Sequence, residues 1–428
     1  MLLTLTKKEC GQYLKSVAYY IFCICLALDF FTQMGEFDVP AKPEKGWESY
    51  GYVRTADKDL IMQETLNKLW SEYSNGSYTT YPIGFYKRVQ LDEAEEEKIV
   101  QIITNCTGMT EEEFSAFQEE YENIREAAME KMLEEQGMEQ GAILENELPD
   151  PDIPIKEGLS FDDFCREMKR ADDLLGGGSS YSEAELQFTT RPQTYEEALE
   201  EYNSFIKNDK ITNAYARLFC DYMGIMLAML PVFLAVGRVL RDRRAQAEQV
   251  IHMKYASSLA IILSRYLTAV LMSLILVLVL SCCPLLQCIY YADRIGEAYD
   301  LFAFVKYIGF WLLPHILITL SVGFFVTEIT DSVAAVLIQG IWWFISVFMS
   351  IGNLVGLCGW NLVPRFNSVG DHAIYEQMKE QLFKNRLMYT AISIVLLLLT
   401  VLVYSKKRKG EFASVRARFV NRKNKLEV

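Results

Sequence analysis

The chain alternates between long apolar runs and one long polar region. A helix needs roughly 20 residues to cross the hydrocarbon core of a bilayer, which is about 30 Å thick. The apolar runs that meet this length extend approximately over Val17–Met34, Phe219–Leu240, Tyr266–Cys288, Phe302–Thr327, Val333–Leu357 and Leu387–Tyr404. The last ends abruptly at four basic residues, 406–409. The pattern predicts an α-helical integral membrane protein with six transmembrane helices.

The first apolar run has two interpretations. A secretory signal peptide would end at a small-residue cleavage site. Here VAYYIFCICLAL is followed by Asp29 and by Phe30-Phe31. This favours an uncleaved membrane anchor.

The polar region, residues 36–211, shows helical periodicity. Helices are predicted within residues 57–76, 91–108 and 110–137, and further helices open at Ser160 and Thr194. In the third, Thr110 and Glu113 have the spacing of a capping box. Flexible joints are predicted at 148–154 and 176–180. A mostly helical domain is therefore expected between the first and second spans.

Charge separates this domain from the rest of the chain. The 428 residues carry a net charge of −14. Residues 36–211 hold 17 basic and 41 acidic side chains, a net of −24, so the remainder carries a net of +10. The basic residues flank apolar runs and form no independent patch, which argues against nucleic-acid binding.

The position of the basic residues predicts the orientation. Lysine and arginine concentrate in cytoplasmic loops, and here they gather at 7–8, at 241–244 and at 406–409. With six spans these three sites share one side. We expect a multi-pass protein of the plasma membrane with both termini in the cytoplasm. The predicted parts are 1–35 (cytoplasmic N-terminus and first helix), 36–211 (acidic extracellular domain), 212–240 (second helix), 241–265 (cytoplasmic segment), 266–404 (helices three to six, with an extracellular segment at 358–386) and 405–428 (basic cytoplasmic tail).

The cysteine and carboxylate patterns predict neither a disulfide framework nor a calcium site. Most of the ten cysteines lie in or near spans; Cys106 and Cys165 fall in the acidic domain and are equally compatible with a disulfide and with free thiols. The acidic runs at 93–97 and 111–113 lack the glycine and the interleaved ligands of a calcium loop, which favours a solvated helix face.

No catalytic motif is present in the sequence. It contains no G-x-x-x-x-G-K-[ST], G-x-S-x-G or H-E-x-x-H. For His315, beside Pro314, a structural hydrogen bond is favoured over a proton relay. Asp29, Asp221 and Glu328 lie near predicted span ends, where water is expected to reach them. We therefore expect no enzyme activity and no cofactor bound by this chain.

The segment 241–265 has a pattern of its own. Ala247, Val250, Ile251 and Tyr255 recur at helical spacing, which predicts an amphipathic helix of about three turns, interrupted by Ser257-Ser258. It is either a loop resting on lipid headgroups or a coupling helix that fits a cleft of an ATP-hydrolysing partner. The residues predicted to contact that partner are Gln246, Glu248, Gln249, Val250, Ile251, His252, Tyr255, Ser257 and Ser258.

Two stretches resemble the type-2 ATP-binding-cassette permease family, the membrane subunits of many bacterial exporters. EQVIHMKYASSLAIILSRYLTAVL looks like the family's coupling segment entering the third span, and FKNRLMYTAISIVLLLLTVLVYSKKRKG is similar to its closing segment. The resemblance covers roughly residues 1–35 and 212–410. The acidic insert of about 175 residues departs from simpler members.

The resemblance implies partners and a mechanism. The chain would pair with itself or with a second permease, in the lipid bilayer, and with two copies of a separate ATPase that holds ATP and Mg. ATPase closure would move the coupling helices and switch the spans between inward- and outward-facing states. The implied cargo is peptide, drug-like or lipid-like, and export is the expected direction.

Two other interpretations remain. A membrane-anchored sensor or accessory protein would bind a ligand through the acidic domain, although the cytoplasmic parts are short for a sensor. A secondary transporter would show internal repeats, and the two sets of three spans show no pseudo-symmetry.

Overall fold

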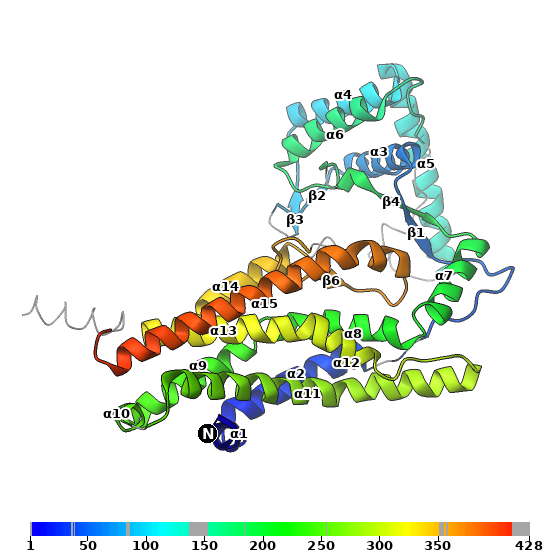
Figure 1. Cartoon of the computed structure of the whole chain (residues 1–428). Helices are drawn as coiled ribbons and strands as arrows, with labels where there is room; N and C mark the ends of the chain where they lie inside the picture. The colour runs from blue at the N-terminus through cyan, green and yellow to red at the C-terminus, as the bar shows by residue number, and fades with distance from the viewer. Residues whose placement is uncertain are drawn as a thin grey trace, which may run out of the picture. The chain divides into compact units, whose positions relative to one another are not determined.

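Figure 1 shows the computed structural model of the chain. It describes residues 2–412 except 36, 38, 83–85, 137–152, 184, 254, 351–354 and 357, with the backbone alone for 129–136 and 248. The chain divides into a helical body, Met1–Lys45 with Tyr195–Val428, and an acidic domain, Gly46–Thr194. Most of the predicted tail (405–428) and most of the joint at 148–154 lie outside the described residues.

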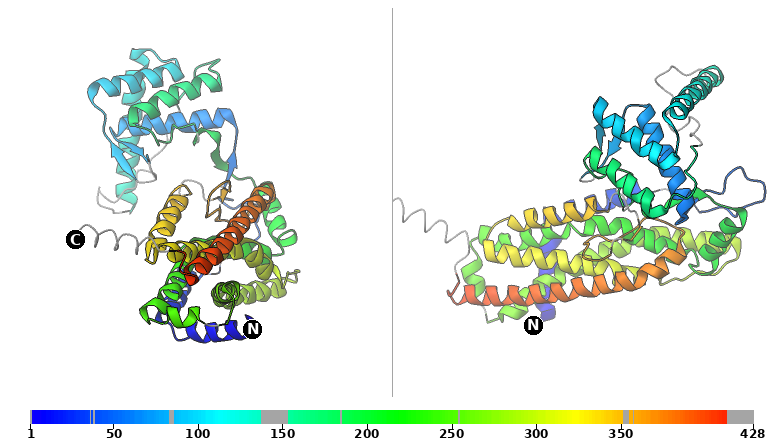
Figure 2. Two further views of the ribbon diagram at one scale, coloured as in Figure 1. Left: turned by 60° about the vertical axis from the view of Figure 1, so that its left-hand side comes forward. Right: turned by 90° about the horizontal axis from the view of Figure 1, so that it is seen from above.

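The helical body consists of apolar helices that run side by side (Figures 1 and 2). Its elements are α1 (Leu2–Tyr13), α2 (Val17–Met34), α7 (Tyr195–Lys207), α8 (Thr212–Leu227), α9 (Pro231–Arg244), α10 (Glu248–His252), α11 (Ser258–Ile295), α12 (Ala303–Tyr307), the π-helical turn η3 (Ile308–Leu312), α13 (Leu313–Thr330), α14 (Ala334–Phe348) and α15 (His372–Arg408). The short strands β5 (Val355–Gly356) and β6 (Arg365–Phe366) pair antiparallel.

Within the described residues, five helical stretches are long and apolar enough to cross a membrane. They are Val17–Met34, Thr212–Arg244, Ser258–Ile295, Ala303–Thr330 and His372–Arg408. This confirms an α-helical membrane protein. The sixth predicted span, Val333–Leu357, contains the 15-residue helix α14, about 22 Å long at 1.5 Å per residue. That is shorter than the hydrocarbon core, and part of the predicted span lies outside the described residues.

The second span is two helices instead of the single helix predicted over Phe219–Leu240. Helix α8 ends at Leu227 and α9 begins at Pro231, since proline lacks the N–H that would continue the helix. The freed carbonyls find partners on neighbouring helices. Gln339 donates to the Ala228 carbonyl at 2.6 Å, and Thr319 donates to the Leu227 and Ala228 carbonyls at 3.2 Å. Such pairing is what makes a break tolerable inside a membrane.

Helix α13 lies at the centre of the helical body. It contacts α9, α15, α14 and α11, and most of its side chains are buried. The approach to α9 is close at Gly323, where a Cβ atom would lie 2.6 Å from the Cβ of Ala235. Small residues allow helices to approach in this way inside membranes.

Gly323→Val is therefore expected to force α9 and α13 apart and to destabilise the helical body by about 1–3 kcal/mol, the usual cost of overpacking. Thermal unfolding of the protein in lipid nanodiscs measures this. Gly237→Val on α9 is the matched control, since nothing lies within 4 Å of a Cβ built there. Equal unfolding temperatures for the two variants would contradict the packing described.

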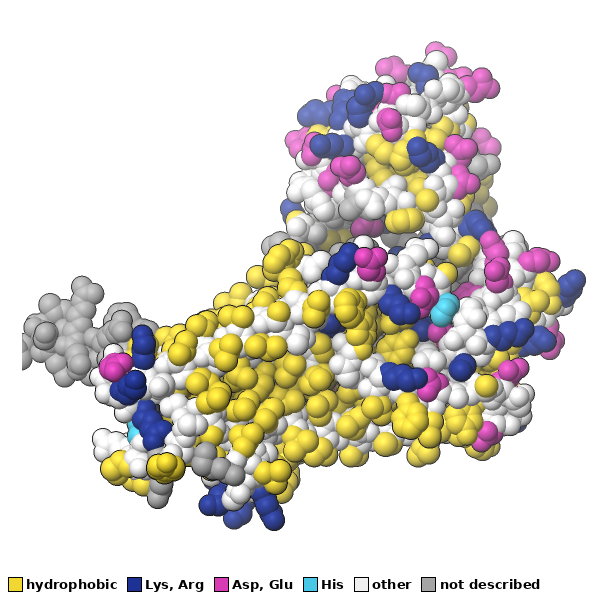
Figure 3. Space-filling view, viewed as in Figure 1, with side chains coloured by type: hydrophobic (Ala, Val, Ile, Leu, Met, Phe, Trp, Pro, Cys, Tyr) yellow, Lys and Arg dark blue, Asp and Glu magenta, His cyan; other side chains and the backbone are white. Residues whose placement is uncertain are grey.

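The outward faces of the helices are apolar. Large exposed hydrophobic side chains follow α2 (Tyr20, Ile21, Ile24, Leu28, Phe31), α11 (Leu267, Leu271, Ile275, Val279), α14 (Leu337, Ile338, Ile341, Phe344) and α15 (Leu387, Ile394, Val395, Leu398, Leu402). On the face that Figure 3 shows, hydrophobic side chains cover the length of the helical body, with mainly Lys and Arg at the end that carries α1 and α10. Apolar side chains in rows of this extent suit contact with lipid tails.

The acidic domain consists of α3 (Lys58–Ser74), α4 (Glu93–Thr107), α5 (Glu111–Gln136), α6 (Phe161–Leu175), the 3-10 turn η2 (Glu185–Gln187) and the strands β1 (Tyr52–Thr55), β2 (Tyr78–Thr80), β3 (Lys87–Val89) and β4 (Thr189–Pro192). Strands β1 and β4 pair antiparallel, as do β2 and β3. The helices predicted before residue 176 are present in this domain, whereas the helix predicted at Thr194 is α7 of the helical body. The capping box forms: the Glu113 carboxylate accepts from the Thr110 amide at 2.8 Å, and the Thr110 hydroxyl accepts from the Glu113 amide at 3.3 Å.

The core of the acidic domain surrounds Trp70. Its ring meets Phe114 and Phe117 edge to face, at centroid distances of 5.0 and 4.9 Å, a favourable aromatic geometry. Cys106 and Cys165 are free thiols. Burial raises the pKa of the Cys106 thiol to about 12, so this thiol stays protonated and behaves as a small apolar side chain.

Candidate functional site at the turn after the second span

The turn after the second span differs from the predicted three-turn amphipathic helix. Helix α9 continues to Arg244, and Gln246 adopts a left-handed conformation with φ of 54°. Helix α10 then has five residues, little more than one turn. The Ser257 hydroxyl accepts from the Ala260 amide at 3.2 Å and caps α11. The break at Ser257-Ser258 is thus present, but the helix before it is shorter than predicted.

The predicted partner-binding residues of this turn lie in two environments. Gln246, Gln249, Val250, Tyr255 and Ser257 are exposed, and Ile251, His252 and Ser258 are partly buried; for Glu248 only the backbone is described. Val250 is 52% exposed and Tyr255 fully exposed. The predicted common face of Ala247, Val250, Ile251 and Tyr255 is therefore wrong, because the chain turns within it.

Met253 is also exposed, at 79%, and was not among the residues predicted from the sequence. We call Val250, Met253 and Tyr255 the exposed apolar triplet. A methionine one residue beyond the end of a short helix gives no periodic signal.

The turn is fastened to the end of α15. Arg408 donates to the carbonyls of His252 at 2.7 Å and Ala256 at 2.6 Å. The His252 ring meets Tyr404 edge to face at 5.4 Å. Ile251 and Ala256 also pack against a small core formed by Ile261, Ile262 and Tyr404. The turn therefore moves with α11 and α15.

Arg408→Ala is expected to remove the hydrogen bonds that hold the backbone of the turn to α15. Hydrogen bonds to a charged donor contribute about 1.5–3 kcal/mol each, so amide hydrogen exchange over residues 251–257 should accelerate by about tenfold or more. Exchange measured by mass spectrometry in nanodiscs tests this, with the exposed Lys406→Ala as control. Equal amide exchange rates over residues 251–257 in the two variants would contradict the role of the Arg408 hydrogen bonds.

A buried ionic cluster lies next to the turn, between α1, α9 and α11. Arg238 donates to Glu9 at 2.7 Å and to Asp242 at 2.9 Å. Arg265 pairs with Asp242 and lies 3.8 Å from Glu9. Both arginine side chains are almost fully buried. Pairs of this kind fix the geometry of three helices, because a separated partner would leave a buried charge uncompensated.

A second ionic cluster joins α9, α13 and α15. Lys407 donates to Asp331 at 2.6 Å and to the Glu328 carbonyl, and Arg243 pairs with Glu328 at 3.4 Å and with Asp331. Glu328 is 2% exposed, so the prediction that water reaches it is wrong. The two clusters make the end of the body that carries α10 a connected unit.

The other end of the helical body holds two further ion pairs. Asp221, predicted to be reached by water, is 1% exposed and accepts two hydrogen bonds from Arg365 at 2.9 Å. Asp209 accepts from Arg217 at 2.6 Å, and His372 lies 2.8 Å away. These pairs hold β6 and the start of α15 to the region around α8.

His315 has the structural hydrogen bond that the sequence favours. Its Nδ1 lies 3.1 Å from the Trp311 carbonyl and 2.8 Å from Arg386. The ring is fully buried beside the π-helical turn that precedes Pro314.

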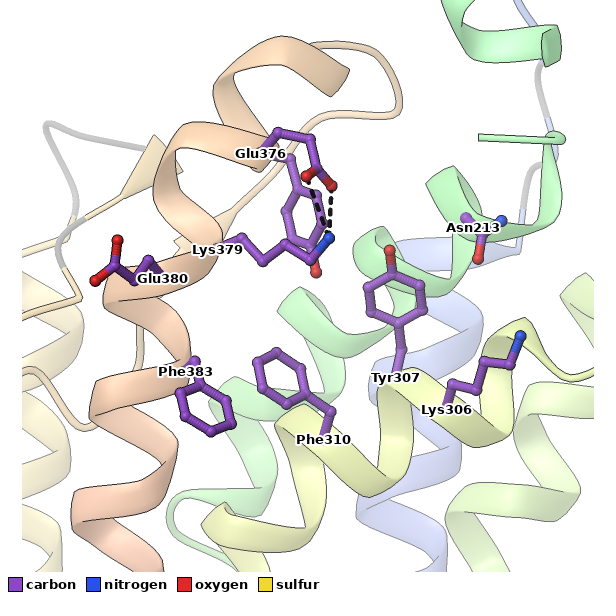
Figure 4. Close-up of a pocket in the computed structure, with 9 residues that line it drawn as sticks. Asn213, Lys306, Tyr307, Phe310, Glu376, Lys379, Glu380 and Phe383 are labelled. Carbon is purple, nitrogen blue, oxygen red and sulfur yellow. Dashed lines mark hydrogen bonds and ion pairs between the residues drawn. The ribbon is translucent and has the colours of Figure 1, made fainter. Parts of the chain in front are cut away.

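A pocket of about 550 Å³ opens between α8, α12, η3 and α15 (Figure 4). The rings of Phe310 and Phe383, which both line the pocket, are stacked with their centroids 6.3 Å apart. Its rim carries Lys306, Lys379 and Glu376, the last two joined by a 2.9 Å ion pair. Aromatic side chains next to charged ones fit a ligand that is part apolar and part polar.

Among the described residues no group of three or more His, Cys, Asp or Glu side chains could hold a metal ion. Comparison with protein-family models, with curated proteins and with solved structures finds no match.

Proposed function

We propose that the chain is the membrane-spanning permease subunit of an ATP-binding-cassette exporter whose ATPase is a separate protein. The observation that carries the proposal is the turn at 245–257. It leaves the apolar triplet uncovered by the rest of the chain, while its backbone is hydrogen-bonded to α15 and its flanking helices are joined by two ionic clusters. Exposed apolar side chains on a rigid base are what a partner protein can bind.

The mechanism follows from this connection. An ATPase that binds the triplet and changes shape on ATP binding would displace the turn. The displacement would pass through Arg408 to α15 and through Arg238 and Arg243 to the other helices, since rigid elements that are connected rock together. ATP and Mg belong to the partner, and no nucleotide site on this chain enters the mechanism.

The orientation in the proposal places the turn and both termini in the cytoplasm of a plasma-membrane protein. The preponderance of Lys and Arg at the end that carries α1 and α10 supports it (Figure 3). The acidic domain would then be extracellular. Two ATPase copies and a second permease, identical or different, would complete the transporter.

The pocket in Figure 4 supports an amphipathic cargo. Phe310, Phe383 and Tyr307 offer contact to an apolar part, and Lys306 with Glu376 and Lys379 offers contact to a polar part. A lipid-like, peptide or drug-like molecule has this character.

Purification of the tagged chain from its native membranes tests the proposal. A stoichiometric subunit that carries a G-x-x-x-x-G-K-[ST] motif is expected, together with ATP hydrolysis by the purified complex. If the chain purifies intact and binds a ligand but no nucleotide-binding subunit accompanies it, the result would favour a sensor and contradict the proposal.

A further inference from the structure

The acidic domain contains a polar cleft of about 770 Å³. It lies between α3, the paired strands β2 and β3, and the residues Ser180, Glu185, Phe188 and Thr189. Helix α3 turns one face, with Leu66, Leu69 and Trp70, into the core. Its other face lines the cleft with the polar side chains Glu64, Lys68, Ser71, Glu72 and Asn75.

The polar groups of the cleft are held in place by the fold. Tyr181 donates to Glu72 at 2.5 Å, and the Thr79 amide donates to the same carboxylate at 3.2 Å. Lys68 donates to Ser180 at 2.6 Å and Arg88 donates to Ser77 at 2.5 Å. Burial raises the pKa of Glu72, although Tyr181 and Lys68 oppose the shift. Polar groups positioned in advance bind a ligand without an ordering cost.

Aromatic side chains also line the cleft. Tyr81, Tyr86 and Phe188 are 50%, 64% and 57% exposed. The rings of Tyr81 and Tyr86 lie 6.1 Å apart and nearly perpendicular. Exposed aromatic rings inside a polar cleft can stack against an apolar face of a ligand.

We propose that this cleft binds a carbohydrate chain. A sugar ring offers hydroxyl groups at its edge and C–H groups on its faces, which match hydrogen-bonding side chains and aromatic rings respectively. The charges on the lining nearly balance, with Glu64, Glu72 and Glu185 against Lys68 and Arg88. Hydroxyls and amides supply most of the remaining polar groups. A neutral ligand rich in hydroxyls fits this lining better than a strongly charged peptide. The proposal does not depend on the transport function.

Calorimetric titration of the full chain tests the proposal, in nanodiscs free of sugar detergents. The probes are hexasaccharides of glucose, N-acetylglucosamine and galactose, with a lysine-rich decapeptide as the competing class. At least one hexasaccharide is expected to bind. Tyr86→Ala and Phe188→Ala should each weaken that binding by about tenfold, which corresponds to 1.4 kcal/mol.

Tyr52→Ala is the matched control, since Tyr52 is 73% exposed in the same domain and lies outside the cleft lining. It should leave the affinity unchanged, and the unfolding temperature of all three variants should stay that of the parent. The proposal is overturned if no hexasaccharide binds, if Tyr86→Ala and Phe188→Ala leave sugar binding intact, or if only the decapeptide binds.

Discussion

Replacing Asp221 by asparagine is expected to destabilise the helical body by about 3–5 kcal/mol, the usual cost of leaving one partner of a buried ion pair without its counter-charge. The Arg365 guanidinium would lose its counter-charge and the hydrogen bond to the oxygen that the amide NH2 replaces, and the Phe366 amide, which donates to the carboxylate at 2.6 Å, would lose an ionised acceptor. We expect the variant to unfold at a lower temperature than the parent in nanodiscs and to be recovered from membranes in lower yield; thermal unfolding and quantified yield measure these effects.

Removal of both charges is the informative control. Asp221→Leu combined with Arg365→Met leaves no uncompensated charge, so the double variant should regain most of the stability. A single Asp221→Asn variant as stable as the parent would show that the pair does not hold β6 to α8.

The second large effect concerns the exposed apolar triplet. If the proposed ATPase binds the triplet, Val250→Asp with Tyr255→Asp should reduce the affinity for it by about 30-fold or more. Truncating a central interface residue costs about 2 kcal/mol or more, and burying an unpaired carboxylate costs further free energy. Insertion and stability should not change, because both side chains are exposed. Recovery of the ATPase with the tagged chain measures the effect.

Tyr52→Asp, at a tyrosine of the acidic domain that is 73% exposed, controls for charge and should leave recovery of the proposed ATPase at the level of the parent. Full recovery with the Val250→Asp, Tyr255→Asp variant would remove the turn from the proposed interface.

The long apolar helices were predictable from the sequence, whereas the conformation of the turn at 245–257 was not. Helix α2 has the predicted bounds Val17–Met34, because a membrane span requires a fixed length of uninterrupted apolar residues. In the turn, a few apolar residues at helical spacing gave the same pattern as a three-turn helix. The break at Ser257-Ser258 was predicted and is present, but the left-handed Gln246 shortens the helix before it, and a single left-handed residue leaves no periodic signal.

Several of the ion pairs could not be predicted because their partners are far apart in the chain. Arg238 and Glu9 are separated by 229 residues, and Arg365 and Asp221 by 144. The sequence shows charges near span ends, where water can hydrate them, and this gives no reason to pair them. Only the packing of α1, α9 and α11 brings Glu9, Asp242 and Arg265 together. The polar cleft also escaped prediction, since its lining comes from three separate segments.

The side of the membrane on which Tyr255 lies tests the central claim most directly. A Tyr255→Cys variant is treated with a membrane-impermeant maleimide in intact cells and after permeabilisation, with the unsubstituted chain as blank and Tyr52→Cys as the outer reference. We expect Tyr52→Cys to react in intact cells and Tyr255→Cys to react only after permeabilisation. Reaction of Tyr255→Cys in intact cells would place the turn outside, where no cytoplasmic ATPase can bind it.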